Sequence, residues 1–76
     1  MNAQQRKKLS CIINELKDYK AQIEEIQSEE KRKQENMPEN LQNSEKADKL
    51  EEQIGELEDA ANSLDEVIES LETCLN

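Results

Sequence analysis

The second half of the chain carries hydrophobic residues whose spacing alternates between three and four. This stripe consists of Ala47, Leu50, Ile54, Leu57, Ala61, Leu64, Ile68, Leu71 and Leu75. A pattern that repeats every 3.5 residues places its apolar side chains along one narrow side of an α-helix, where they can pack against another helix. We therefore predict a coiled-coil helix over about residues 45–75.

A second stripe with the same spacing runs through the first half of the chain. It consists of Leu9, Ile12, Leu16, Tyr19, Ile23 and Ile26. Asn2 is a suitable N-cap for this helix, and Gln5 stands where a capping box needs it. The only proline, Pro38, falls between the two stripes and cannot continue a helix. Asn43 or Ser44 is then the natural N-cap of the second helix.

These signals predict an all-α protein that is an antiparallel two-helix hairpin, with residues 1–76 as one unit. We expect a helix over about residues 3–35, a turn over about 36–44 and a helix over about 45–75. Each arm is about 30 residues long, or roughly 45 Å at 1.5 Å per residue.

The two stripes also predict how the helices are aligned. The expected layers are Leu9 with Leu71, Ile12 with Ile68, Leu16 with Leu64, Tyr19 with Ala61, Ile23 with Leu57 and Ile26 with Ile54. In this register the large Tyr19 meets the small Ala61, which matches the volumes of the two side chains. The flanking positions bring opposite charges together, because Arg6 lies beside Glu72 and Lys20 beside Glu58.

A further apolar line on the second helix is left over by this register. Ala60, Val67 and Cys74 form the line, and Ile13 adds an apolar flank on the first helix. The resulting face is wider than one partner helix can cover. A hairpin of this size also has little stability alone. We predict a homo-oligomer with these four residues at its interface, most simply a dimer that forms a four-helix bundle. The alternative is a monomer with Val67 half exposed.

Composition and charge exclude a conventional globular core and point to an acidic surface. The chain is 33% hydrophobic, has no Phe or Trp, and carries a net charge of −9. No basic residue follows Lys49. The acidic side chains that we single out as a binding surface are Glu58, Asp59, Glu66 and Glu69. Such a surface can imitate nucleic-acid phosphates or dock into a basic groove on a protein. The alternative is a solvated face that keeps the protein soluble.

The turn is rich in side-chain amides. Asn36, Pro38, Asn40 and Gln42 are candidates for a recognition tip with several hydrogen-bond donors and acceptors. The simpler interpretation is turn chemistry, in which Asn36 caps the first helix and Pro38 stops it.

The chain resembles a group of small acidic helical-hairpin proteins of unknown function from phages, prophages and mobile elements of Gram-positive bacteria. The similarity covers nearly the whole sequence and is most specific in the run NMPENLQNSEK over residues 36–46. It also includes RKKL at residues 6–9 and LDEVIESLE at residues 64–72. The resemblance implies a phage or mobile-element setting and no particular site residues.

Most catalytic chemistry lacks the residues it needs. The chain has no His, no glycine-rich phosphate loop, and two cysteines that are far apart in sequence. We therefore expect a non-enzymatic protein with no cofactor. Three acidic pairs, Glu56 with Asp59, Glu66 with Glu69 and Glu69 with Glu72, have the spacing of Mg²⁺-binding carboxylates in helical nucleotide pyrophosphatases. A carboxylate-metal nucleotide hydrolase is the alternative that they leave open.

The same features narrow the partners and the location. The basic cluster Arg6 to Lys8 has no aromatic stacking partners, so we expect no direct nucleic-acid binding. We also expect no membrane association, because charged residues interrupt every apolar run. Unpaired cysteines fit the reducing cytoplasm, which is the host cytoplasm for a phage-encoded protein.

Together these observations favour a protein-interaction module of phage or mobile-element type. It would act as an acidic decoy or inhibitor of a host or defence protein. A self-assembling structural or assembly protein is the main alternative, ahead of the nucleotide hydrolase.

Overall fold

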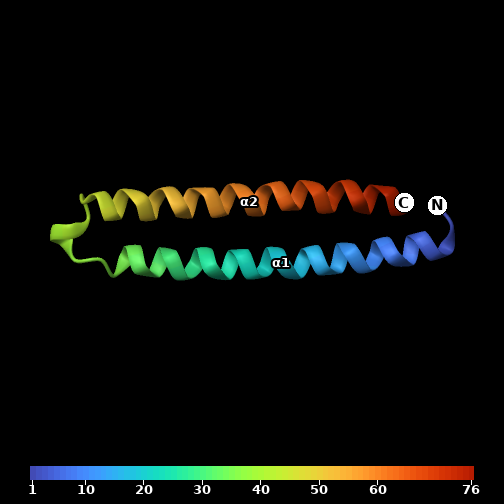
Figure 1. Ribbon diagram of the computed structural model, residues 1–76, viewed down its shortest axis with the longest axis horizontal. Helices are drawn as coiled ribbons and strands as arrows, with labels where there is room; N and C mark the ends of the chain where they lie inside the picture. The colour runs from blue at the N-terminus through green and yellow to red at the C-terminus, as the bar shows by residue number, and fades with distance from the viewer.

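The computed structural model describes all residues, 1–76, as two long helices that lie side by side and run in opposite directions (Figure 1). Helix α1 spans Ala3–Glu35, a short 3-10 helix η1 spans Glu39–Leu41, and helix α2 spans Glu45–Leu75. Both termini lie at one end of the rod and the turn lies at the other. The Cα atoms extend over 60 × 14 × 14 Å. The predicted all-α two-helix hairpin is confirmed.

Local hydrogen bonds fix the start of each long helix. At α1, the Gln5 backbone N–H donates to the Asn2 side chain at 2.8 Å, and the Asn2 backbone N–H donates to the Gln5 side chain at 3.0 Å. At α2, the Ala47 N–H donates to the Ser44 hydroxyl at 3.3 Å. Both predicted N-caps, including the capping box, are therefore present, and Ser44 rather than Asn43 caps α2.

The turn closes through backbone hydrogen bonds without any residue in the left-handed region. The Asn36 N–H donates to the Arg32 carbonyl at 3.0 Å and ends α1. Within the turn, the Leu41 N–H donates to the Pro38 carbonyl at 2.9 Å, and the Ser44 N–H donates to the Leu41 carbonyl at 3.1 Å. The turn is therefore satisfied internally and needs no glycine.

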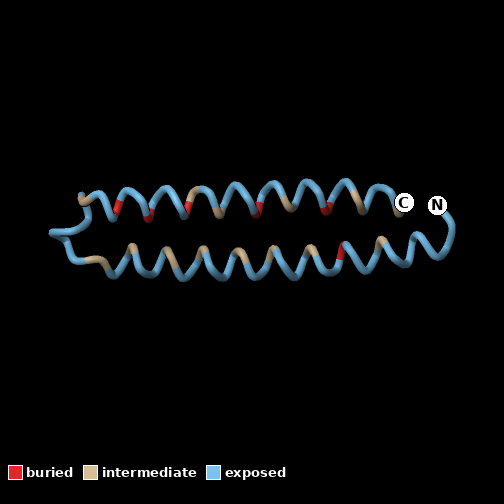
Figure 2. The backbone as a smooth tube through the Cα atoms, in the orientation of Figure 1, coloured by how far each residue is buried: buried red, intermediate tan, exposed pale blue.

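The buried and partly buried residues of both long helices lie on the sides that face each other (Figure 2). The buried residues are Ile13, Ala47, Leu50, Ile54, Ala61 and Ile68. Five of these six belong to α2, and the remaining members of its stripe, Leu57, Leu64, Leu71 and Leu75, are partly buried. The predicted core stripe of the second helix is confirmed.

The side of α1 that faces α2 differs from the predicted stripe. Its buried or half-buried residues are Leu9, Ile13, Leu16, Lys20, Ile23, Gln27, Glu30 and Gln34. The predicted stripe members Ile12, Tyr19 and Ile26 are instead 42%, 56% and 48% exposed. Helix α1 therefore keeps its Leu9, Leu16 and Ile23 positions at the core, but it is rotated so that Ile13 is buried and Ile12 is not.

The alignment of the helices is also shifted from the predicted register. Lys20 Nζ lies 2.8 Å from a carboxylate oxygen of Asp65, not beside Glu58. The Arg6 guanidinium donates to the Leu75 backbone carbonyl rather than reaching Glu72. Each observed partner lies further toward the C-terminal end of α2 than the predicted one. The observed partner lies seven residues further along α2 for Lys20 and three residues further for Arg6, which is roughly two helical turns and one turn.

The correction has a physical reason that the apolar pattern alone does not contain. Helix α1 has apolar residues on both sides of its central line, with Ile12 on one side and Ile13 on the other. Either side can be turned toward a single partner helix. The observed orientation buries Ile13 and aligns Lys20 with Asp65 across the interface. It leaves the Ile12 side of α1 open.

Candidate functional site

The exposed apolar residues of the hairpin form two lines, one on each helix. On α1, Ile12, Tyr19 and Ile26 recur every seven residues, so they lie along one side of the helix. On α2, Ala60, Val67 and Cys74 recur with the same period and are also exposed. An exposed line on each helix is the pattern of a second packing surface, next to the core that the two helices already share.

Both lines border the same side of the hairpin. Ile26 of α1 and Gln53 and Leu57 of α2 line one surface groove. Gln53 stands seven residues before Ala60 and therefore belongs to the line that continues through Val67. We call the surface formed by Ile12, Tyr19, Ile26, Ala60, Val67 and Cys74 the apolar face.

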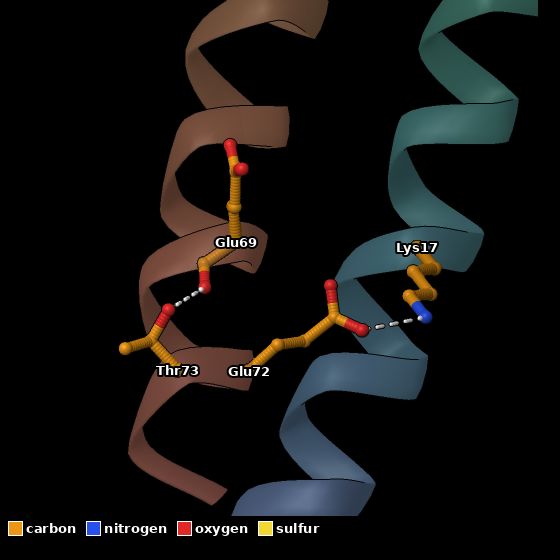
Figure 3. A network of polar contacts seen from close by, with 4 residues as sticks. All are labelled: Lys17, Glu69, Glu72 and Thr73. Carbon is orange, nitrogen blue, oxygen red and sulfur yellow. Dashed lines mark hydrogen bonds and ion pairs between the residues drawn. The ribbon is translucent and has the colours of Figure 1, made fainter. Parts of the chain in front are cut away.

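The opposite side of the hairpin carries the ion pairs between the helices. Lys20 pairs with Asp65 at 2.8 Å, and Lys17 pairs with Glu72 at 3.4 Å (Figure 3). Lys17 precedes Tyr19 by two residues, and Asp65 precedes Val67 by two, which is a rotation of about 200° around each helix. The ion pairs and the apolar face therefore lie on opposite sides.

The observed contacts relate the two lines along the rod. Ile26 shares a groove with Gln53 and Leu57. Lys17 and Lys20 stand on either side of Tyr19 in the sequence, and they pair with Glu72 and Asp65, which stand on either side of Val67. Ser63 and Ser70 border the α2 line, so this side of α2 has no charge between Leu57 and Leu75. The apolar face is therefore an uncharged strip that runs along the middle of α1 and the C-terminal half of α2.

Sequence reasoning identified only part of this face. Ala60, Val67 and Cys74 were expected at an oligomer interface, and they are exposed on the apolar face. Ile13 does not, because it is 4% exposed and packs between the two helices. Ile12, Tyr19 and Ile26 were missed as interface residues because they were assigned to the hairpin core. The signal that could have found them is the width of the apolar pattern on α1, which exceeds what one partner helix covers.

Lysines on the ion-pair side are held by their carboxylate partners. Lys20 also lies 4.0 Å from Glu24 of its own helix. A hydrogen bond to Asp65 raises the pKa of Lys20 above its ordinary value, and the nearby negative charges of Asp65 and Glu24 add to the effect. Asp65 and Glu72 therefore each pair with a lysine of α1.

The four acidic candidates of α2 have no lysine or arginine partner of this kind. Glu58, Asp59, Glu66 and Glu69 are all exposed, and none of them forms an ion pair. At Glu69 only the backbone carbonyl is engaged, since it accepts from the Thr73 hydroxyl at 3.0 Å (Figure 3). We call these four residues the acidic edge. They lie away from the apolar face, so a protein covering that face leaves them accessible.

The tip candidates Asn36, Pro38, Asn40 and Gln42 are exposed and lie together in one turn. Their hydrogen bonds serve the turn itself. The Asn36 backbone caps α1, Pro38 accepts from the backbone that follows it, and the Gln42 amide donates weakly to the Met37 carbonyl at 3.5 Å. Their contacts therefore match turn chemistry and do not indicate a ligand.

Three lysines lie beside the tip on the same side as the apolar face, and Glu30, Glu52 and Glu56 line the grooves with them. Lys33, Lys46 and Lys49 line one groove there, and Lys33 and Lys49 also line the groove that contains Ile26. Lys33 pairs with Glu30 at 2.8 Å, and this hydrogen bond raises the pKa of Lys33. Lys46 and Lys49 form no ion pair. We call these three residues the tip lysines.

The structure shows no group of three or more His, Cys, Asp or Glu side chains close enough to hold a metal ion. The acidic pairs that include Glu56 and Glu69 therefore gain no third ligand from the fold. Cys11 and Cys74 are both exposed free thiols. Neither α1 nor α2 is long and apolar enough to cross a lipid bilayer.

Comparisons of the chain with protein-family models, with curated proteins and with solved structures find no match. The functional interpretation therefore depends on the surfaces described above.

Proposed function

We propose that this protein is a non-enzymatic interaction module that dimerises through its apolar face into a four-helix bundle. The observation that carries the proposal is the uncovered strip itself, on which Ile12, Tyr19 and Val67 are 42%, 56% and 48% exposed. Full burial of a large apolar side chain contributes about 1.5–3 kcal/mol, so covering these half-exposed residues contributes about 1 kcal/mol each.

The apolar face alone is smaller than a complete dimer interface. The hairpin is 14 Å wide between Cα extremes. The face runs from Ile12 to Ile26 and from Ala60 to Cys74, or roughly 21 Å along each helix, so it covers roughly 300 Å² of each hairpin. A specific interface of about 1,200 Å² in total would therefore also include the residues that border the face.

A second copy is the occupant that the pattern favours. The face repeats every seven residues on both helices, and another hairpin offers two helices with the same period. The charge of the chain, −9, opposes association of like molecules. Since the acidic edge lies away from the apolar face, its carboxylates stay in water when two copies meet and cost little.

A matched pair of lysine substitutions tests the dimer. Val67→Lys places a charge in the middle of the apolar face, and a buried unpaired charge is strongly unfavourable. Asn62→Lys adds the same charge on an exposed position of α2 away from that face. We expect sedimentation equilibrium to give a helical monomer for Val67→Lys and a dimer for Asn62→Lys. A dimer of unchanged affinity in Val67→Lys would contradict the proposal.

A second proposed activity belongs to the acidic edge, which we propose to dock onto a basic surface of another protein. Its support is that four exposed carboxylates have no partner within the hairpin. In the dimer the edge is present twice, so a partner with two basic sites gains avidity. In a phage or mobile-element setting, such a partner would be a host or defence protein whose phosphate-binding groove the edge occupies.

Neutralisation of equal numbers of carboxylates tests this activity. One variant combines Glu58→Gln, Asp59→Asn, Glu66→Gln and Glu69→Gln. The control combines Asp18→Asn, Glu25→Gln, Glu35→Gln and Glu39→Gln, which are exposed acids outside the edge. We expect the native protein and the control to retain a basic host protein at low salt and release it at high salt. Equal capture by both variants would contradict a role for the edge.

A further inference from the structure

We infer that the two hairpins of the dimer point in opposite directions, with their turns at opposite ends and Tyr19 and Val67 at the two-fold axis. This inference rests on the proposed dimer and specifies how its apolar faces meet. It assigns a further pair of contacts, between Lys8 of one copy and Glu29 of the other.

Two arrangements bring the apolar faces together around a two-fold axis. If the axis runs along the rod, both turns lie at the same end and α1 packs on α2 of the second copy. If the axis crosses the rod, the turns lie at opposite ends, α1 packs on α1, and α2 packs on α2. Side-chain volume and charge favour different arrangements.

Volume alone favours the first arrangement. That arrangement, with both turns at the same end, sets Tyr19 opposite Val67 of the second copy, so each large side chain of α1 meets a smaller one of α2. The second arrangement instead pairs large with large along α1 and small with small along α2. Helices accommodate such layers by changing their separation, which varies by about 2 Å with the side chains at the contact. The volume preference is therefore weak.

Charge opposes the first arrangement. With both turns at the same end, the tip lysines of one copy face those of the other across the interface. Only Lys33 of the three has a carboxylate partner, Glu30 at 2.8 Å. Like charges that face each other at an interface are strongly unfavourable. In the second arrangement Lys46 and Lys49 extend past the end of the other hairpin into solvent. Repulsion between the tip lysines therefore favours the arrangement in which the two hairpins point in opposite directions.

The order of residues beside the apolar face supports the same choice. Lys8, Glu15, Gln22 and Glu29 recur every seven residues along the border of the face on α1. Reversal about Tyr19 sets Lys8 against Glu29 and Glu15 against Gln22. Reversal about Val67 sets Ser63 against Ser70 on the α2 border. Lys17 and Lys20, which flank Tyr19, pair with Glu72 and Asp65, which flank Val67, so one axis can pass close to both residues.

Charge exchange between Lys8 and Glu29 tests the inference. The two residues are 21 positions apart on one straight helix, or roughly 31 Å, so they cannot meet within one copy. We expect Lys8→Glu and Glu29→Lys each to weaken the dimer about two- to tenfold, since each change breaks two symmetric pairs, and the double variant to restore it. Dimer dissociation constants are measured by sedimentation equilibrium.

The outcomes separate this inference from the proposed dimer. A native monomer would overturn the dimer itself. A dimer in which Glu29→Lys associates more tightly would overturn the inference, because with both turns at one end Glu29 lies beside Glu56 of the second copy and its reversal relieves repulsion. A dimer that all three variants leave unchanged would overturn it as well.

A cysteine at the axis gives a second readout. In a Cys11→Ser, Cys74→Ser background, Val67→Cys should form an intermolecular disulfide on mild oxidation, since the two copies of residue 67 meet at the axis within disulfide reach. Asn62→Cys in the same background is the control for random collisions. A reduced dimer of Val67→Cys that oxidises no faster than this control would contradict opposite directions, whereas a reduced monomer would count against the dimer.

Discussion

Two adjacent isoleucines of α1 have opposite surroundings. Ile13 is 4% exposed in the core, whereas Ile12 is 42% exposed on the apolar face. The spacing of apolar residues cannot assign them, because both fit a heptad that includes Leu9, Leu16 and Ile23. The assignment depends on contacts between the helices, such as Lys20 with Asp65, which long side chains reach from more than one register.

Alanine substitution at these two positions measures which side of α1 faces α2. In the Val67→Lys background, which we expect to be monomeric, Ile13→Ala should lower the free energy of unfolding by about 2–3 kcal/mol, because it removes a buried side chain. Ile12→Ala should lower it by less than about 1 kcal/mol. Urea unfolding followed by circular dichroism gives both values. A larger loss for Ile12→Ala would show that the predicted stripe forms the core.

At the scale of whole elements, the sequence predicts what depends on local chemistry. The helix ends can be predicted from the sequence, because they depend on hydrogen bonds and backbone restrictions within a few residues. The N-caps Asn2 and Ser44 and the helix stop at Pro38 are of this kind. The core stripe of α2 can also be predicted from the sequence, because that helix has one dominant apolar side. The rotation of α1 and the register cannot be predicted in this way, since they are set by contacts far apart in sequence.

Gly55 offers a test of α2 as an element. It lies in the middle of the helix, and a Cβ added there would meet nothing within 4 Å. Glycine costs up to about 1 kcal/mol relative to alanine inside a helix. Gly55→Ala should therefore raise the free energy of unfolding by about 0.5–1 kcal/mol in urea titrations, and leave dimerisation unchanged. A loss of stability would reveal a close neighbour at this position that the hairpin does not contain.

On the scale of the whole molecule, the hairpin separates its surfaces by charge. The apolar face occupies one side, the ion pairs Lys17–Glu72 and Lys20–Asp65 occupy the other, and the acidic edge lies free of both. The sequence indicated half of the apolar face, on α2, and the whole acidic edge. It missed the α1 half because the same residues were needed to build the predicted core. A dimer would bury the uncharged strip and display the acidic edges.

The most direct test of this account is sedimentation equilibrium of the native protein from about 0.05 M to about 0.5 M salt. The account predicts a species of twice the chain mass of 8.8 kDa. It also predicts tighter association as salt rises, because salt screens the repulsion between two chains of charge −9 while burial of the apolar face persists. A mass of 8.8 kDa at every salt concentration, at protein concentrations up to about 100 μM, would contradict the account.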